Sequence, residues 1–171
     1  MKTAICLLLA CTVGCSGYQH RFTTPPGFDG IDTIAVDIFK NRTLYMDIAE
    51  EFALELAREI NSKTDLRIED RGSSDAVITG SIDSYTRKVL REFENDDVSR
   101  YAIIITVSYQ VVRLPSQGQP EQVIASGDRL FYSSEYEVAS NRTEQDARAE
   151  AARRAAREVV SHIFETWEGK E

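Results

Sequence analysis

Cysteine and histidine are scarce in this chain of 171 residues, and their positions exclude several kinds of chemistry. All three cysteines lie within the first 15 residues, so the remainder can form neither an internal disulfide nor a thiolate metal cluster. The two histidines, His20 and His162, lack the spacing of a metal-binding motif, and the sequence has no phosphate-loop, dinucleotide-binding, zinc-protease or serine-hydrolase motif. We therefore expect no metal ion, no cofactor and no catalytic residues, and the chain does not resemble an enzyme.

Positive charge is also in the minority. Lysine and arginine total 20 against 28 aspartates and glutamates, which gives a formal net charge of −8. A nucleic-acid-binding protein would show a basic stripe, and broad attraction to an anionic lipid surface would need an excess of basic residues. Nucleic acid is therefore not an expected partner.

The N-terminus has the pattern of a bacterial secretory signal that ends at a lipidated cysteine. Lys2 precedes an apolar run over residues 4–10, and a small residue then precedes a cysteine. This run is much shorter than the roughly 20 apolar residues that a membrane-spanning helix needs. We expect the protein to be exported and held on a membrane by an N-terminal lipid, while the domain itself need not contact the bilayer.

Two cysteines can carry that lipid. Cys11 has the better preceding sequence, with leucine three positions before it, whereas Cys15 leaves a signal of more plausible length. We prefer Cys15, with Cys11 as the alternative, so that residues 1–14 form the signal peptide and residues 15–30 form the lipidated N-terminus and a tether. Neither cysteine is followed by aspartate, which favours the outer membrane, with the protein on the periplasmic side.

The spacing of apolar residues predicts a regular series of strands and helices. Alternating patterns predict strands over 31–39, 66–69, 75–90, 100–114 and 122–138. A helical repeat follows the first strand; Thr43 or Asp47 can cap this helix, which runs to about Ser62. A second helix is capped by Thr143 and runs to about Trp167.

The order of these elements predicts the fold class. A strand, a helix and a short strand are followed by a meander of three long strands and a closing helix. Each helix has one apolar stripe, so both helices would cover one face of a mainly antiparallel sheet of four to five strands. We expect a single α+β domain over residues 31–168. In its first strand, Ile34, Val36 and Ile38 should share one face.

The meander would bring several basic residues to one end of the sheet. The turn at 91–99 and the connection at 138–143 would lie at the same end, because the strands alternate in direction. The basic residues near that end are Arg87, Lys88, Arg91, Arg100 and Arg142. They can bind phosphate or carboxylate groups, which arginine holds in bidentate fashion, or pair with the acidic residues nearby. Arg91 and Arg142 are the preferred binding candidates because they flank the predicted loops.

Several stretches of the sequence are similar to one family. Cys15-Ser16-Gly17-Tyr18 resembles the Cys-Gly-Tyr start of the LptE family of lipopolysaccharide-assembly lipoproteins, with one serine inserted. Residues 34–43, 75–85 and 101–107 resemble the family's first strand with its turn and two of its long strands, and the closing helix is also similar. The resemblance extends over nearly the whole chain after the signal.

The resemblance implies a function that the search for catalytic motifs does not. LptE-like proteins plug the large outer-membrane β-barrel LptD, assist its assembly and help pass lipopolysaccharide to the outer leaflet. The implied partners are therefore an LptD-like barrel, lipopolysaccharide, and the membrane through the N-terminal lipid. Phosphate groups of lipopolysaccharide would be natural ligands for clustered arginine and lysine.

Other functions remain open from the sequence. The pattern of the first strand also occurs in lipoproteins that activate peptidoglycan synthases and in secretion-pore lipoproteins. An activator would have a longer tether than residues 16–30, and a pore subunit would need membrane-spanning strands of about 9–11 residues with apolar outer faces. Arg100, Gln110 and Arg113 interrupt such a face on the strongest strand. A soluble periplasmic hydrolase is disfavoured by the missing catalytic motifs.

Overall fold

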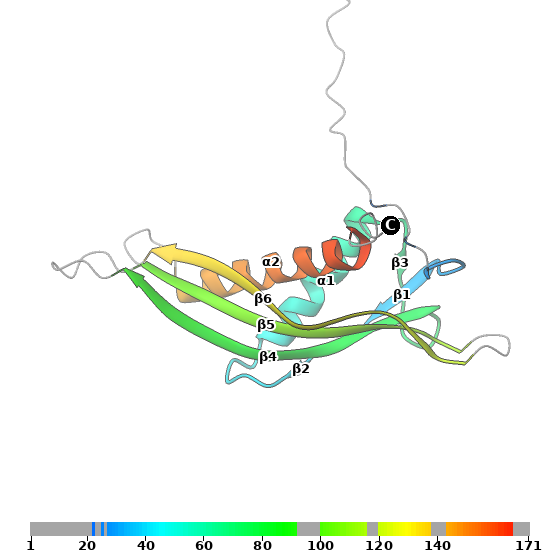
Figure 1. Cartoon of the computed structure of the whole chain (residues 1–171), viewed down its shortest axis with the longest axis horizontal. Helices are drawn as coiled ribbons and strands as arrows, with labels where there is room; N and C mark the ends of the chain where they lie inside the picture. The colour runs from blue at the N-terminus through cyan, green and yellow to red at the C-terminus, as the bar shows by residue number, and fades with distance from the viewer. Residues whose placement is uncertain are drawn as a thin grey trace, which may run out of the picture.

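The structure is a computed structural model that describes residues 22, 25, 27–91, 100–115, 120–137 and 143–165. In this part of the chain, two helices lie on one face of a curved six-stranded sheet (Figure 1). The strands are β1 (Thr33–Val36), β2 (Lys40–Asn41), β3 (Arg67–Ile68), β4 (Ala76–Arg91), β5 (Arg100–Arg113) and β6 (Gln122–Glu137), and the helices are α1 (Ile48–Lys63) and α2 (Glu144–Glu165).

The sheet confirms the predicted α+β class and differs from the prediction in two respects: it has six strands rather than four to five, because β2 was not predicted, and some of its pairings are parallel. Strands β4, β5 and β6 form the expected antiparallel meander. However, β1 runs parallel to both β3 and β4, and β2 runs parallel to β4, so the six-stranded sheet is mixed. Neighbouring parallel strands need a crossover connection, and α1 supplies it between β1 and β3.

The first strand is shorter than predicted, and one of its expected core residues faces solvent. Ile34 and Ala35 are adjacent in sequence and both buried, because Ile34 belongs to the main core and Ala35 packs in a second apolar cluster with Val77 and Val112. The prediction that Ile38 shares a buried face with Ile34 is wrong: Ile38 is 68 % exposed. The chain leaves β1 before this residue, and the next residue, Phe39, is buried instead.

Helix α1 has the predicted apolar stripe. The fully buried members are Ile48, Phe52, Leu56 and Ile60. Of the two predicted caps, Asp47 is the one observed, although its side chain makes no capping hydrogen bond. At the other end, the Thr64 hydroxyl donates to the Ile60 carbonyl at 2.8 Å and satisfies one of the last acceptors of the helix.

Helix α2 begins with the predicted reciprocal cap. The Thr143 amide donates to the Asp146 carboxylate at 2.9 Å, and the Asp146 amide donates to the Thr143 hydroxyl at 3.1 Å. The predicted buried positions Ala152, Ala155, Ala156, Val159 and Ile163 are all buried. Trp167 lies outside the described residues. Within those residues, neither helix is long and apolar enough to cross a membrane.

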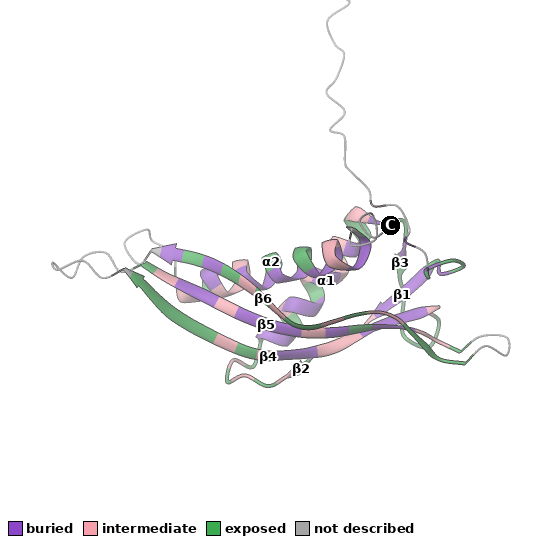
Figure 2. Ribbon diagram, in the orientation of Figure 1, coloured by how far each residue is buried: buried purple, intermediate pink, exposed green. Residues whose placement is uncertain are grey.

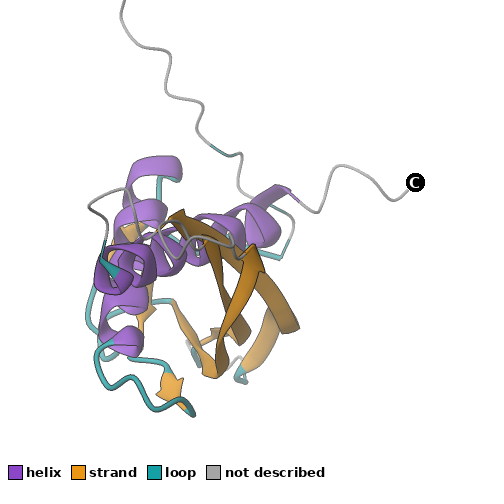
Figure 3. Cartoon of the chain, turned by 90° about the vertical axis from the view of Figure 1, so that its left-hand side faces the viewer, coloured by secondary structure: helices purple, strands orange, loops and turns teal. Residues whose placement is uncertain are grey.

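The main core lies between the helices and one face of the sheet, as Figures 2 and 3 show. Strand β5 contributes Ile103, Ile105, Val107, Tyr109 and Val111, which alternate along the strand and are all buried. Each fully buried aliphatic side chain of this kind contributes roughly 1.5–3 kcal/mol. An edge-on contact between Phe39 and Phe52, with ring centroids 4.8 Å apart, joins α1 to the sheet. The opposite face of the long strands is left without a covering helix (Figure 3).

Candidate functional site

The end of the sheet at which β4 ends carries most of the predicted basic residues. Lys88 is the register partner of Ala102, and Arg91 that of Arg100, so the end of β4 and the start of β5 lie side by side (Figure 1). Residues 86–90 are exposed there (Figure 2). The structure thus brings four of the five candidates to one end of the sheet. Arg142 and the side chain of Arg91 lie outside the described part of the chain.

Arg87 lies on the face that carries the helices. Its guanidinium donates to the Glu144 carboxylate at 2.9 Å and lies 5.0 Å from the centre of the Tyr101 ring. Hydrogen bonding to Tyr136, together with the charge of Glu144, raises the pKa of Arg87 above its usual value. For this residue the structure shows pairing with an acidic neighbour, and the pair links β4 to the start of α2.

Lys88 lies on the opposite face, because successive residues of a strand point to opposite sides of the sheet. It begins a row across the sheet that continues through Ala102 to Glu135, and both charged members of the row are exposed. Arg100 is also exposed, and its register partners are Arg91 on β4 and Glu137 on β6. The predicted basic cluster is therefore divided between the two faces of the sheet.

Aromatic side chains pack against one another at this end of the sheet, on the face that carries the helices. The rings of Tyr101 and Tyr136 stack at 5.4 Å, and those of Tyr45 and Tyr85 lie 4.1 Å apart. Burial, together with the neighbouring charge of Glu144, raises the pKa of Tyr85 above its usual value. These contacts fix the end of β4 against α2 and against the loop that follows β2.

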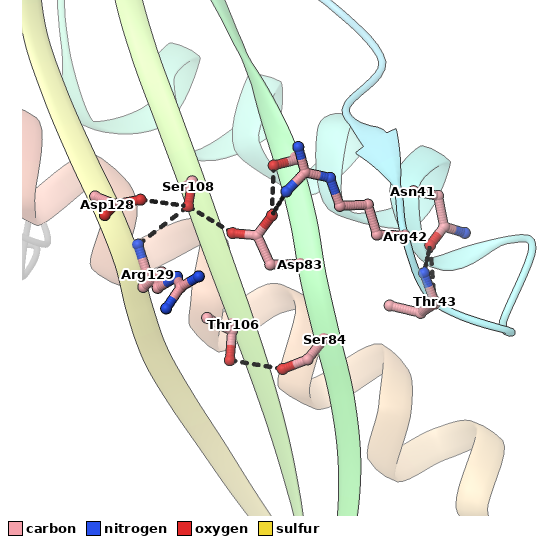
Figure 4. Close-up of polar contacts among 10 residues, drawn as sticks. Asn41, Arg42, Thr43, Asp83, Ser84, Thr106, Ser108, Asp128 and Arg129 are labelled. Atoms are coloured by element: carbon pink, nitrogen blue, oxygen red, sulfur yellow. Dashed lines mark hydrogen bonds and ion pairs between the residues drawn. The ribbon is translucent and has the colours of Figure 1, made fainter.

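The face without helices carries a polar network that the sequence did not predict (Figure 4). The Asp83 carboxylate accepts from Ser108 at 2.5 Å, from Ser81 at 2.7 Å and from Arg42 at 2.9 Å. Burial alone would raise the pKa of Asp83, but these hydrogen bonds and the charge of Arg42 outweigh it and lower the pKa. The network therefore holds an ionised carboxylate between β4, β5 and the end of β2.

A shallow hollow of about 380 Å³ lies beside this network. Its polar lining comes from three strands and consists of Thr79, Ser81, Ser108, Gln110, Ser126 and Asp128. The hollow forms where β6 bulges, so that Asp128 and Arg129 together face Ser108. The alternating threonine, serine and glutamine residues of β5 indicate a polar outer face in the sequence, and Gly127 within β6 is the one local signal of the bulge.

The model of a protein family described as LptE, lipopolysaccharide-assembly, matches residues 31–164. The chain belongs to the LptE family. The matched range contains every strand and nearly all of α2, so the membership predicted by resemblance is confirmed. A comparison with curated protein sequences finds no match.

Solved structures similar to this LptE-family chain confirm the fold. The hypothetical protein CT253 from Chlamydia trachomatis is 12 % identical with a TM-score of 0.53, covering 80 % of this chain and 99 % of that one. A putative lipoprotein from Caulobacter crescentus is 18 % identical with a TM-score of 0.51, covering 85 % and 95 %. PelC from Paraburkholderia phytofirmans is 16 % identical with a TM-score of 0.50, covering 84 % and 96 %. At such identities the likeness concerns the fold alone.

Proposed function

We propose that this LptE-family protein is the lipoprotein partner of an LptD-like outer-membrane β-barrel. It is anchored by a lipid on Cys15, or alternatively Cys11, on the periplasmic side of the outer membrane. It occupies the barrel as a plug, assists its assembly and takes part in the passage of lipopolysaccharide. The observation that carries the proposal is the family match across residues 31–164. The role requires no catalytic residue.

The distribution of polar residues on the sheet supports a place inside a barrel. Both helices cover one face, and the opposite face presents hydroxyl and amide groups such as those of Thr79, Ser126 and Gln110. The lumen of a large outer-membrane barrel is polar, so this face suits contact with it without burying unsatisfied groups of either partner. An apolar outer face, by contrast, would suit lipid.

The basic residues at the end of the sheet where β4 ends support a contact with phosphate groups of lipopolysaccharide. Lys88 and Arg100 are exposed there in a protein whose net charge is −8. Arg91 and Arg142 flank the turns and complete the proposed site, because arginine can hold a phosphate through two parallel hydrogen bonds. Arg87 has a different role in this proposal, since Glu144 already holds its guanidinium.

Binding of purified lipopolysaccharide to the full chain and to single variants tests the phosphate site. We expect Arg91→Ala and Arg142→Ala each to weaken binding about tenfold, the loss of one charge-assisted contact of about 1.4 kcal/mol. The control is Arg58→Ala on α1, which removes an exposed arginine far from these turns in sequence whose ion pair in the described part of the chain is with Glu55 on its own helix. Equal affinity for all three variants and the unchanged protein would contradict binding at this end.

A further inference from the structure

The loop between β2 and α1 presents two long apolar side chains to solvent. Leu44 is 97 % exposed and Met46 is 88 % exposed, the highest values among the large hydrophobic residues that the structure describes. We refer to these two side chains as the apolar tip. A lone exposed leucine needs no explanation, but two such residues on one loop form a surface that an interaction would bury.

Hydrogen bonds hold this loop in a defined conformation (Figure 4). The Asn41 carboxamide oxygen accepts from the Thr43 amide and from the Thr43 hydroxyl, both at 2.8 Å. The amide nitrogen of the same side chain donates to the Tyr45 carbonyl at 2.6 Å, and the Tyr45 amide donates to the Thr43 hydroxyl at 3.2 Å. The loop is therefore already ordered before a partner binds, so binding does not have to order it.

Tyr45, which lies between the two exposed residues, points inward and anchors the loop. Its ring lies 4.1 Å from that of Tyr85 on β4, and the Arg148 guanidinium of α2 lies 5.3 Å from its centre. Since Tyr45 is held in this way, Leu44 and Met46 are directed away from the domain as a pair. Rigid presentation of apolar anchors lowers the entropy that binding costs.

The charges beside the apolar tip indicate the chemistry of its partner. Asp47 and Glu50 are exposed directly after it, and one carboxylate oxygen of Glu51 is enclosed without a hydrogen-bond partner among the described residues. The guanidinium of the nearby Arg42 forms an ion pair with the Asp83 carboxylate at 2.9 Å. An apolar tip bordered by acids suits an apolar protein pocket with a basic rim. It does not suit a bilayer surface, where inserting tips are bordered by lysine and arginine.

We propose that the apolar tip docks into an apolar, basic-rimmed pocket of the LptD-like barrel. The proposal rests on the proposed function, and it adds a contact that is distinct from the polar outer face and from the basic end of the sheet. Leu44 and Met46 fill the pocket, and the rim pairs with Asp47 and Glu50. The tip thereby fixes the orientation of the domain within the barrel.

Site-specific photo-cross-linking of the full chain, co-expressed with its LptD-like barrel, tests the contact. A photoreactive residue at position 44 or 46 should cross-link to the barrel, and one at position 54 should not. Leu54 is the matched control, because it is a leucine of α1 that is 53 % exposed. In the same system, Leu44→Asp and Met46→Asp should each reduce co-purification of the barrel at least tenfold, and Leu54→Asp should leave it unchanged. All three variants should keep the thermal stability of the unchanged protein, because they alter exposed side chains.

The outcomes separate this contact from the proposed function. If the unchanged protein forms the complex but positions 44 and 46 give no cross-link, the tip proposal is overturned and the barrel partnership stands. Equal cross-linking from position 54 would also overturn it, because the contact would not be specific to the tip. Flotation with phospholipid vesicles that is lost in Leu44→Asp would assign the tip to the membrane instead. If the unchanged protein forms no complex, both proposals are contradicted.

Discussion

Replacing Gly80 with alanine should destabilise the fold, because the space that a Cβ atom would occupy is already filled. An added Cβ would lie 2.2 Å from the Ser108 carbonyl oxygen and 2.6 Å from the Phe39 ring. The first contact is with backbone, which cannot rotate away, so β4 and β5 would have to separate locally. Phe39 would be pushed toward Phe52, its neighbour on α1 at 4.8 Å between ring centroids.

The expected magnitude follows from two opposing effects. Overpacking of a filled core usually costs about 1–3 kcal/mol, and a clash with backbone belongs at the upper end of that range. Replacing glycine with alanine also restricts the unfolded chain, which returns about 0.4–1 kcal/mol. We therefore expect Gly80→Ala to lower the free energy of unfolding by about 2 kcal/mol. For a domain of this size, that lowers the Tm by about 4–8 °C.

Equilibrium urea unfolding followed by circular dichroism measures this loss. Gly72→Ala is the matched control, because a Cβ at Gly72 meets no atom within 4 Å and the position is exposed. The control should change the free energy of unfolding by less than about 0.5 kcal/mol. If Gly80→Ala were as stable as the unchanged protein, the close packing of Phe39 over β4 would be refuted.

Three further substitutions test the fold. The Asp75 carboxylate accepts a hydrogen bond from the Thr33 hydroxyl at 2.7 Å, and this bond lowers the pKa of Asp75. The ionised carboxylate therefore stabilises the fold fully above about pH 4, and this stabilisation is lost as the pH falls through the lowered pKa. Asp75→Asn should therefore reduce stability in urea at pH 7 more than at pH 2, and an equal loss at both would contradict this. Thr143→Ala should lower the free energy of unfolding by about 1 kcal/mol, because it removes the cap of α2. Unchanged hydrogen exchange in the first turn of α2 would contradict this capping role. Leu56→Ala should lower the free energy of unfolding in urea by about 3 kcal/mol, whereas Leu54→Ala, at an exposed position of the same helix, should change it little. Similar losses for both variants would contradict the assigned buried face of the helix.

Local pattern was sufficient to predict the helices and the meander. The repeat at Ile48, Phe52, Leu56 and Ile60 identifies the buried side of α1, and the threonine and aspartate at 143 and 146 mark the start of α2. These signals depend only on neighbours within a few residues. The parallel pairing of β1 could not be read in the same way, because it depends on strands that lie more than 30 residues away along the chain.

The structure places four of the predicted basic residues at one end of the sheet, but the sequence did not predict the contacts that they make there. Alternation within a strand already requires Arg87 and Lys88 to face opposite sides of the sheet, so this division could have been predicted. The pairing of Arg87 with Glu144 depends on how α2 packs against β4, which the sequence does not specify. Nor does the sequence reveal that Tyr45 turns inward and leaves Leu44 exposed, because a long-range ring contact with β4 decides that orientation.

Cross-linking in outer membranes tests the proposed partnership most directly. Photoreactive residues would replace Thr86 on β4 and Ile104 on β5, which are register partners on the sheet face without helices. The account predicts capture of one large β-barrel protein of the LptD type from both positions. Capture of a peptidoglycan synthase, or of further copies of this chain, without the barrel would contradict it.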